Sequence, residues 1–244
     1  MNTMDLFLLF SSVLLSGSAF YFFKEPSKRM LKLLLSFSGA YLFAISVLHL
    51  MPEVYENRGA GIGAWIMAGF FLQIILEYFS EGIEHGHIHV HHHHDHSAFP
   101  LSMMISLSLH SFLEGMPLAA DAGTEHGLHE HSLLYGIILH HIPVAFALVS
   151  MLQASGITKK KSFLYLILFA SMAPLGALSG ELLQHNDISF ITAYADQIMA
   201  LVIGIFLHIS TTILFESGSD HRFNLYKLVA ILTGGLLGLG SFYF

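Results

Sequence analysis

The sequence predicts an all-α polytopic membrane protein with eight transmembrane helices and both termini on the outer side. The first observation is composition: 54% of the 244 residues are hydrophobic, only 11% are charged, and the mean hydropathy is +0.65. Such a composition excludes an ordinary soluble domain. The second is that the apolar residues fall into eight runs, and the third is that basic residues collect in alternate connections between them.

Each apolar run reaches or nearly reaches the ~20 residues that a helix needs to cross a bilayer. The runs cover residues 4–23, 31–51, 60–80, 101–121, 132–153, 162–184, 191–215 and 225–243. The first run follows Met-Asn-Thr-Met-Asp, without a basic segment or a small-residue cleavage pattern, so we expect a retained helix rather than a signal peptide. We expect one transmembrane domain over residues 1–244.

The basic residues predict the orientation of these helices. Nine of the ten Lys and Arg residues flank or lie in the first, fifth and seventh connections, and Arg58 is the exception. Cytoplasmic connections of membrane proteins carry an excess of Lys and Arg. The odd-numbered connections are therefore expected in the cytoplasm and both termini outside, in a multi-pass protein of the cell membrane.

A histidine and a carboxylate lie in the middle of the fourth run. His110 and Glu114 are four residues apart, which places them one turn apart on one face of a helix. An ionisable residue at the bilayer centre costs roughly 2.5–3.5 kcal/mol on insertion scales, so such residues are rare and mostly functional. Pro117 cannot donate a hydrogen bond to the carbonyl of Leu113, so we expect an open backbone acceptor beside the pair.

The fifth run repeats this design with His140 and His141 at mid-depth, followed by Pro143. Imidazole and carboxylate groups are ligands for divalent transition metals, and the absence of cysteine excludes thiolate sites. The two runs therefore predict the halves of one metal site. The alternative is a set of histidines that only bridge packed helices.

Polar residues at four-residue spacing on other runs predict a route to and from this site. His49 and Glu53 lie near the outer end of the second run, and Glu77 lies on the third. His208 and Glu216 descend along the seventh run toward the cytoplasm. The alternative is that these are ordinary polar helix ends.

The third connection, residues 82–99, is rich in histidine between His85 and His96. Such a tract is expected to be disordered and able to bind metal, so we predict an auxiliary cytoplasmic metal-collecting loop. A purification tag is the mundane alternative, but tags are more uniform and sit at termini. A smaller cluster at residues 125–131 could collect metal on the outer side, or could be a plain solvated loop.

Three motifs resemble those of the ZIP (Zrt-/Irt-like) family of divalent-metal transporters. They are His110-Ser-Phe-Leu-Glu114-Gly on the fourth run, His140-His-Ile-Pro143 on the fifth and His49-Leu-Met-Pro52-Glu53 on the second. The resemblance implies uptake of zinc, or of Fe2+, Mn2+, Co2+ or Cd2+, into the cytoplasm through a site between helices four and five. It implies a transporter and not an enzyme, with the metal as substrate and no separate cofactor.

The resemblance also implies roles for single residues. His110 and Glu114 take the principal ligand positions, and His140 takes the first position of the fifth-helix motif. Ser111 stands where asparagine is common, and His141 stands at an often acidic position, so both are candidate ligands. The family commonly has a second carboxylate or a histidine where this chain has Val144. We therefore expect one metal ion, bound by His110, Glu114 and His140.

The expected mechanism is alternating access around a midplane site whose ligands replace the hydration shell of the ion and still release it. Protonation of the ligands competes with metal, so transport should fall at low pH. The main alternative is an intramembrane zinc-dependent hydrolase with Glu114 as general base. A receptor that binds without translocating and an efflux protein of the cation diffusion facilitator type are weaker alternatives. We expect a divalent ion and the lipid bilayer as partners and no nucleic acid, and leave a homodimer open.

Overall fold

The computed structural model describes residues 2–22, 28–80, 101–121, 131–185, 194–215 and 225–243, and no strand occurs within these ranges. The predicted all-α class is confirmed over these residues. The α-helices are α1 (Thr3–Ala19), α2 (Lys28–Ile45), α3 (Met51–Arg58), α4 (Gly63–Ser80), α5 (Leu101–Gly115), α6 (Leu118–Asp121), α7 (Ser132–Ala154), α8 (Lys159–His185), α10 (Ala195–Phe215) and α11 (Leu225–Tyr243).

Helical elements occupy each of the eight predicted runs, but not all of them meet the length of a membrane span. Within the described ranges, five segments are long and apolar enough to cross a membrane: Arg29–Arg58, Ala60–Ser80, Ser132–Ala154, Lys159–Leu182 and Ala195–Phe215. The apolar helices α1 and α11 are shorter, and α5 ends at Gly115. The described residues therefore contain several helices with the length and composition of a membrane span, while the number of eight stays a prediction.

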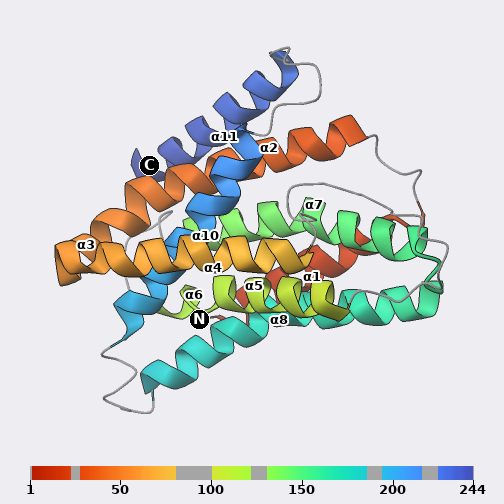
Figure 1. Cartoon of the computed structure of the whole chain (residues 1–244), viewed down its shortest axis with the longest axis horizontal. Helices are drawn as coiled ribbons and strands as arrows, with labels where there is room; N and C mark the ends of the chain where they lie inside the picture. Colours follow the sequence, from red (N-terminus) through yellow and green to blue (C-terminus); the bar gives the residue numbers. More distant parts are fainter. Residues whose placement is uncertain are drawn as a thin grey trace.

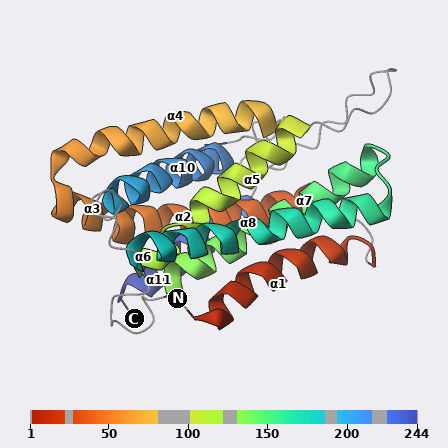
Figure 2. The same ribbon diagram turned by 90° about the horizontal axis from the view of Figure 1, so that it is seen from below.

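The helices form one bundle in which partners distant in sequence lie side by side (Figures 1 and 2). The most extensive contacts join α2 with α11, α4 with α10, α5 with α8 and α1 with α7. Both views place the two chain ends toward the end of the bundle that also contains α3 and α6. Termini at one end of a bundle are expected when a chain crosses the membrane an even number of times.

The second predicted run ended at residue 51, whereas the helix that contains it continues to Arg58. A π-helix, Ser46–Leu50, joins α2 to α3, and the amide of Met51 donates to the carbonyl of Ser46. A single π-turn of this kind is a common way to absorb a local disruption, and Pro52, which has no N–H, follows directly. Hydropathy did not reveal the extension because α3 is polar.

Glycines allow several pairs of helices to approach at backbone distance. A Cβ at Gly69 of α4 would overlap the carbonyl oxygen of Leu201 in α10, and one at Gly176 of α8 would overlap that of Phe112 in α5. Small residues permit such contacts between membrane helices. The α5–α8 contact positions the helix that carries His110 and Glu114.

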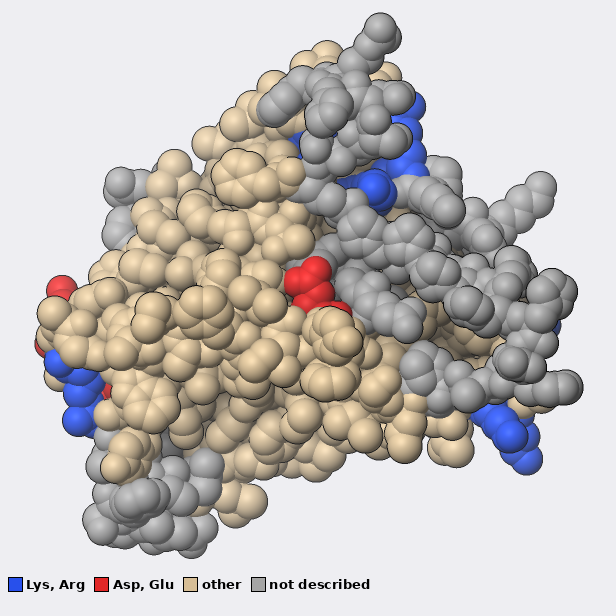
Figure 3. Space-filling view, viewed as in Figure 1, with Lys and Arg blue, Asp and Glu red and all other residues tan. Residues whose placement is uncertain are grey.

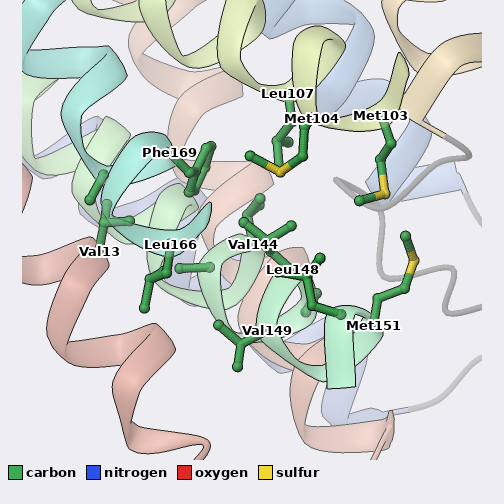
Figure 4. Close-up of a cluster of buried hydrophobic side chains, with 14 of the residues drawn as sticks. Val13, Met103, Met104, Leu107, Val144, Leu148, Val149, Met151, Leu166 and Phe169 are labelled. Carbon is green, nitrogen blue, oxygen red and sulfur yellow. The ribbon is translucent and has the colours of Figure 1, made fainter. Parts of the chain in front are cut away.

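The interior divides into two hydrophobic clusters. The first core cluster includes Met103, Met104 and Leu107 of α5, residues 144–152 of α7 and Phe169 of α8, part of which is shown in Figure 4. The second includes Leu118 of α6, Leu133, Leu134 and Ile137 of α7 and Ala173 of α8. Along α7 the two histidines fall between members of the two clusters, and His110 of α5 falls between Leu107 of the first cluster and Leu118 of α6 in the second. The polar residues therefore lie at a layer inside the bundle, with apolar packing on both sides along the helices.

The outer surface of the bundle is apolar over large areas. Figure 3 shows one face dominated by uncharged residues, with basic atoms toward its periphery and an acidic patch near its centre. Exposed large apolar side chains include Met67, Phe71 and Tyr78 of α4, Leu164 of α8 and Leu236 of α11. Soluble monomers rarely expose contiguous apolar patches of more than a few hundred Å². Lipid is the solvent that suits this surface.

Candidate metal centre

Helix α5 presents two adjacent ligand groups to the interior. The Nε2 atom of His110 lies 3.2 Å from Oε1 of Glu114, and both side chains are 0–1% exposed. Their spacing of one helical turn creates this proximity within a single element. The end of the helix differs from the prediction: the Met116 amide donates to the carbonyl of Leu113 at 3.3 Å. That carbonyl is therefore not an open acceptor, because Pro117 ends the α-helix and the last turn tightens to a shorter-range bond.

Helix α7 contributes the third member of the group. One ligand atom each from His110, Glu114 and His140 lies within 4.8 Å of the other two, and all three residues are buried. Two ligands of one zinc ion, each at ~2.1 Å from it, can be no more than ~4.2 Å apart. One ion therefore fits after at most a small inward movement of these side chains. Two imidazoles and one carboxylate form a donor set typical of zinc and similar transition metals.

The charge of this group is poorly matched by the protein alone. Glu114 is fully buried between two hydrophobic clusters. A buried carboxylate is costly unless it is paired or coordinates a metal. The side chains around Glu114 are imidazoles, and a divalent cation bound among them would balance the negative charge of the carboxylate.

The neighbours of the group have different contacts. His141 lies with Nε2 2.7 Å from Oε2 of Glu114 and with its ring 5.6 Å from that of Phe169, but it is not a member of the three-residue group. The Ser111 hydroxyl is buried, with no hydrogen-bond partner among the described residues. Val144 belongs to the first core cluster, where Figure 4 shows it among apolar side chains.

The residues predicted to form a route are placed outside this group. His208 of α10 has Nε2 2.6 Å from Oε2 of Glu77 on α4, so the structure joins these two. His49 is half-buried in the π-helix, and Glu53 is exposed on α3. Glu216 lies outside the described residues, as does the predicted loop at 82–99.

Two contacts of functional residues could not be found by spacing. The pair of His141 with Glu114 joins α7 to α5, and the pair of His208 with Glu77 joins α10 to α4. The Phe70 ring also packs edge-on against His208, with centroids 4.9 Å apart. No periodicity within one helix indicates how a second helix is rotated against it.

A membrane-type helical bundle with a buried His–Glu group between its helices belongs to the class of polytopic proteins that handle metal ions within the bilayer. The family model described as ZIP zinc transporter matches residues 99–240, which is more than half of the chain, and the protein belongs to this family. The matched region contains all three residues of the group. The resemblance stated from the three motifs is thereby confirmed.

Relatives with similar sequences carry the same family name. The chain is 28% identical to zinc transporter ZIP9-B of Xenopus laevis over 122 residues, which is 50% of this chain and 40% of that relative. It is 27% identical to zinc transporter ZIP9 of Micropogonias undulatus over 124 residues, which is 51% of this chain and 40% of that relative. Zinc transporter ZupT of Chlorobium phaeovibrioides is 25% identical over 236 residues, 86% of this chain and 85% of that relative.

Proposed function

We propose that this protein carries zinc, or a similar divalent transition-metal ion, across the cell membrane into the cytoplasm. The observation that carries the proposal is the buried group of His110, Glu114 and His140 between two hydrophobic clusters. A metal site at this depth serves an ion that crosses the bundle. The relatives named zinc transporters support zinc as the substrate.

The proposed mechanism is alternating access of this group to the two sides of the membrane. The group offers one carboxylate and two neutral imidazoles. Such a site can replace the hydration shell of a transition-metal ion without holding it as tightly as a closed structural site. The basic residues predict which end of the bundle faces the cytoplasm, and the inward direction is what membership of the ZIP family implies.

We further propose that the site holds one ion. Val144 follows His140 by one turn, but it contributes to the first core cluster and offers no ligand atom. A second divalent ion close to the first would need additional negative charge, and Glu114 is the single carboxylate of the three-residue group.

The contact of His208 with Glu77 is proposed as a step on the route from the site to the cytoplasm. It is only partly buried, with 10% of the His208 side chain and 26% of the Glu77 side chain exposed. His49 and Glu53 are proposed to line the outer approach, with Glu216 and the histidine-rich residues 82–99 at the inner side. These assignments rest on the predicted topology.

The geometry supports transport better than the alternative of an intramembrane zinc hydrolase. A hydrolase needs a general base beside the metal-bound water, outside the coordination sphere. Glu114 instead lies within the group of ligand atoms, 3.2 Å from His110.

The test is flux of radiolabelled zinc into liposomes that contain the purified full chain, with protein-free liposomes as the control. We expect saturable uptake, and competition by Fe2+, Mn2+, Co2+ and Cd2+ ranks the substrates. Zinc binding without uptake would favour a receptor and contradict the proposal. Metal-dependent cleavage of a peptide or lipid, without flux, would favour the hydrolase.

A further inference from the structure

The carboxylate of Glu114 has two oxygens, and they face different partners. Oε1 lies 3.2 Å from Nε2 of His110, a member of the three-residue group. Oε2 lies 2.7 Å from Nε2 of His141. His141 is not a member of the group, although it is next to His140 in sequence. The two neighbouring histidines of α7 therefore meet Glu114 in different ways.

The chemistry of the short contact fixes what His141 does there. A carboxylate that coordinates a metal ion is ionised and has no proton to give, so in the metal-bound state the imidazole N–H at Nε2 donates and Oε2 accepts. A hydrogen bond to an ionised acceptor is short and roughly twice as strong as a neutral one. A nitrogen that carries this proton has no lone pair for a metal ion. The Nδ1 atom of His141 is buried and has no hydrogen-bond partner within the described part of the chain.

The packing around the ring holds it in this orientation. His141 is 1% exposed, and its ring lies 5.6 Å from that of Phe169, a member of the first core cluster. Consecutive residues of an α-helix point in directions ~100° apart. His140 can therefore face the group while His141 is directed to the other side of Glu114.

We propose that His141 is a positioning residue, which holds Oε2 of Glu114 so that Oε1 is aimed at the ion. The protein ligands are then the imidazoles of His110 and His140 and the Glu114 carboxylate. This inference rests on the proposed function, in that the transported ion binds at these three residues. Ligating carboxylates in metal sites are commonly hydrogen-bonded by such outer partners, whose loss costs about 10–100-fold in metal affinity.

The test separates a donor of a hydrogen bond from a metal ligand by two substitutions at one position. His141→Gln places an amide N–H near the position of Nε2, and amides are poor ligands for zinc. His141→Leu removes the donor and keeps the site apolar. His140→Gln is the matched control on the same helix, one residue away. Zinc affinity is measured by titration calorimetry on the full chain with the histidines between 85 and 96 replaced by serine, so that they bind no zinc.

We expect zinc affinity within about 3-fold of the parent for His141→Gln and a loss of about 10–100-fold for His141→Leu. His140→Gln should lose more than either. Equal large losses of zinc affinity in His141→Gln and His141→Leu would overturn the proposal. That result would be expected if the His141 imidazole were itself a zinc ligand, because an amide cannot replace it. No loss in His141→Leu would also overturn it.

A second measurement needs no substitution at position 141, and so covers the case in which His141→Leu does not fold. X-ray absorption of the zinc-loaded parent at substoichiometric zinc counts the imidazoles in the first shell. Two imidazoles support a positioning role, and three overturn it. The proposed function fails separately: a parent that binds zinc with two imidazoles but moves none in liposomes would keep His141 in its positioning role and exclude transport.

Discussion

At Glu114, one carboxylate meets imidazoles from two helices, His110 at 3.2 Å and His141 at 2.7 Å. These residues are buried, so water does not compete for the contacts. Sequence spacing predicts the first contact, because both residues lie on one helix. The second depends on the rotation of α7 against α5. Spacing within one helix therefore determines that His110 and Glu114 are adjacent, and the packing of α7 against α5 determines how His141 meets Glu114.

The proposed ligands predict a binding phenotype. His110→Ala and His140→Ala each remove a nitrogen ligand, so zinc affinity measured by titration calorimetry should fall by at least about 100-fold. Glu114 keeps its contact with His141 in both variants, so the protein should stay folded by size-exclusion chromatography. Leu109→Ala is the control, because Leu109 is 48% exposed beside His110 on the same helix. Parent-like affinity in either histidine variant would remove that residue from the site.

The pair of Glu77 with His208 predicts a different phenotype. Glu77→Gln keeps a hydrogen-bonding group near His208 but removes the charge that would attract a departing cation. We expect the liposomal zinc flux to fall several-fold while equilibrium affinity at the central site is unchanged. Tyr78→Phe is the control, because Tyr78 is 80% exposed on the adjacent position. Unchanged flux in Glu77→Gln would exclude this residue from the route.

At the scale of elements, the contact of α5 with α8 sets the position of the site. Gly176→Ala would place a methyl group against the carbonyl oxygen of Phe112. Overpacking typically costs about 1–3 kcal/mol, more than the gain from replacing glycine in a helix. The melting temperature in detergent should therefore fall. Gly235→Ala is the control, since nothing lies within 4 Å of a Cβ there, and it should be neutral or slightly stabilising.

The sequence was informative where a feature depends on one helix. Apolar runs predicted helical elements, and the four-residue spacing of His110 and Glu114 predicted a shared face. The polar composition of α3 concealed its helix, because hydropathy detects contact with lipid and not hydrogen bonding. The turn after Gly115 was predicted incorrectly, since a carbonyl that loses its α-helical donor can accept from Met116 instead.

At the scale of the whole molecule, the topology decides which side of the membrane each end of the proposed route faces. The chain contains no cysteine, so single cysteines can be introduced as unique labels. Asn2→Cys should react with a membrane-impermeant maleimide added outside intact cells. Thr158→Cys, beside the basic residues 159–161, should react only after the membrane is opened. The reverse pattern would place the termini in the cytoplasm and overturn the predicted inward orientation.

The central claim is that a divalent ion crosses the membrane by way of the buried group that contains Glu114. Glu114→Ala removes the buried carboxylate, so we expect a folded protein with a loss of about 1–3 kcal/mol from the broken hydrogen bond with His141. The most direct measurement is radiolabelled zinc uptake by liposomes containing either the parent or Glu114→Ala at equal protein content. We predict saturable uptake with the parent and uptake no faster than in protein-free liposomes with the variant. Equal uptake by the two proteins would contradict the claim.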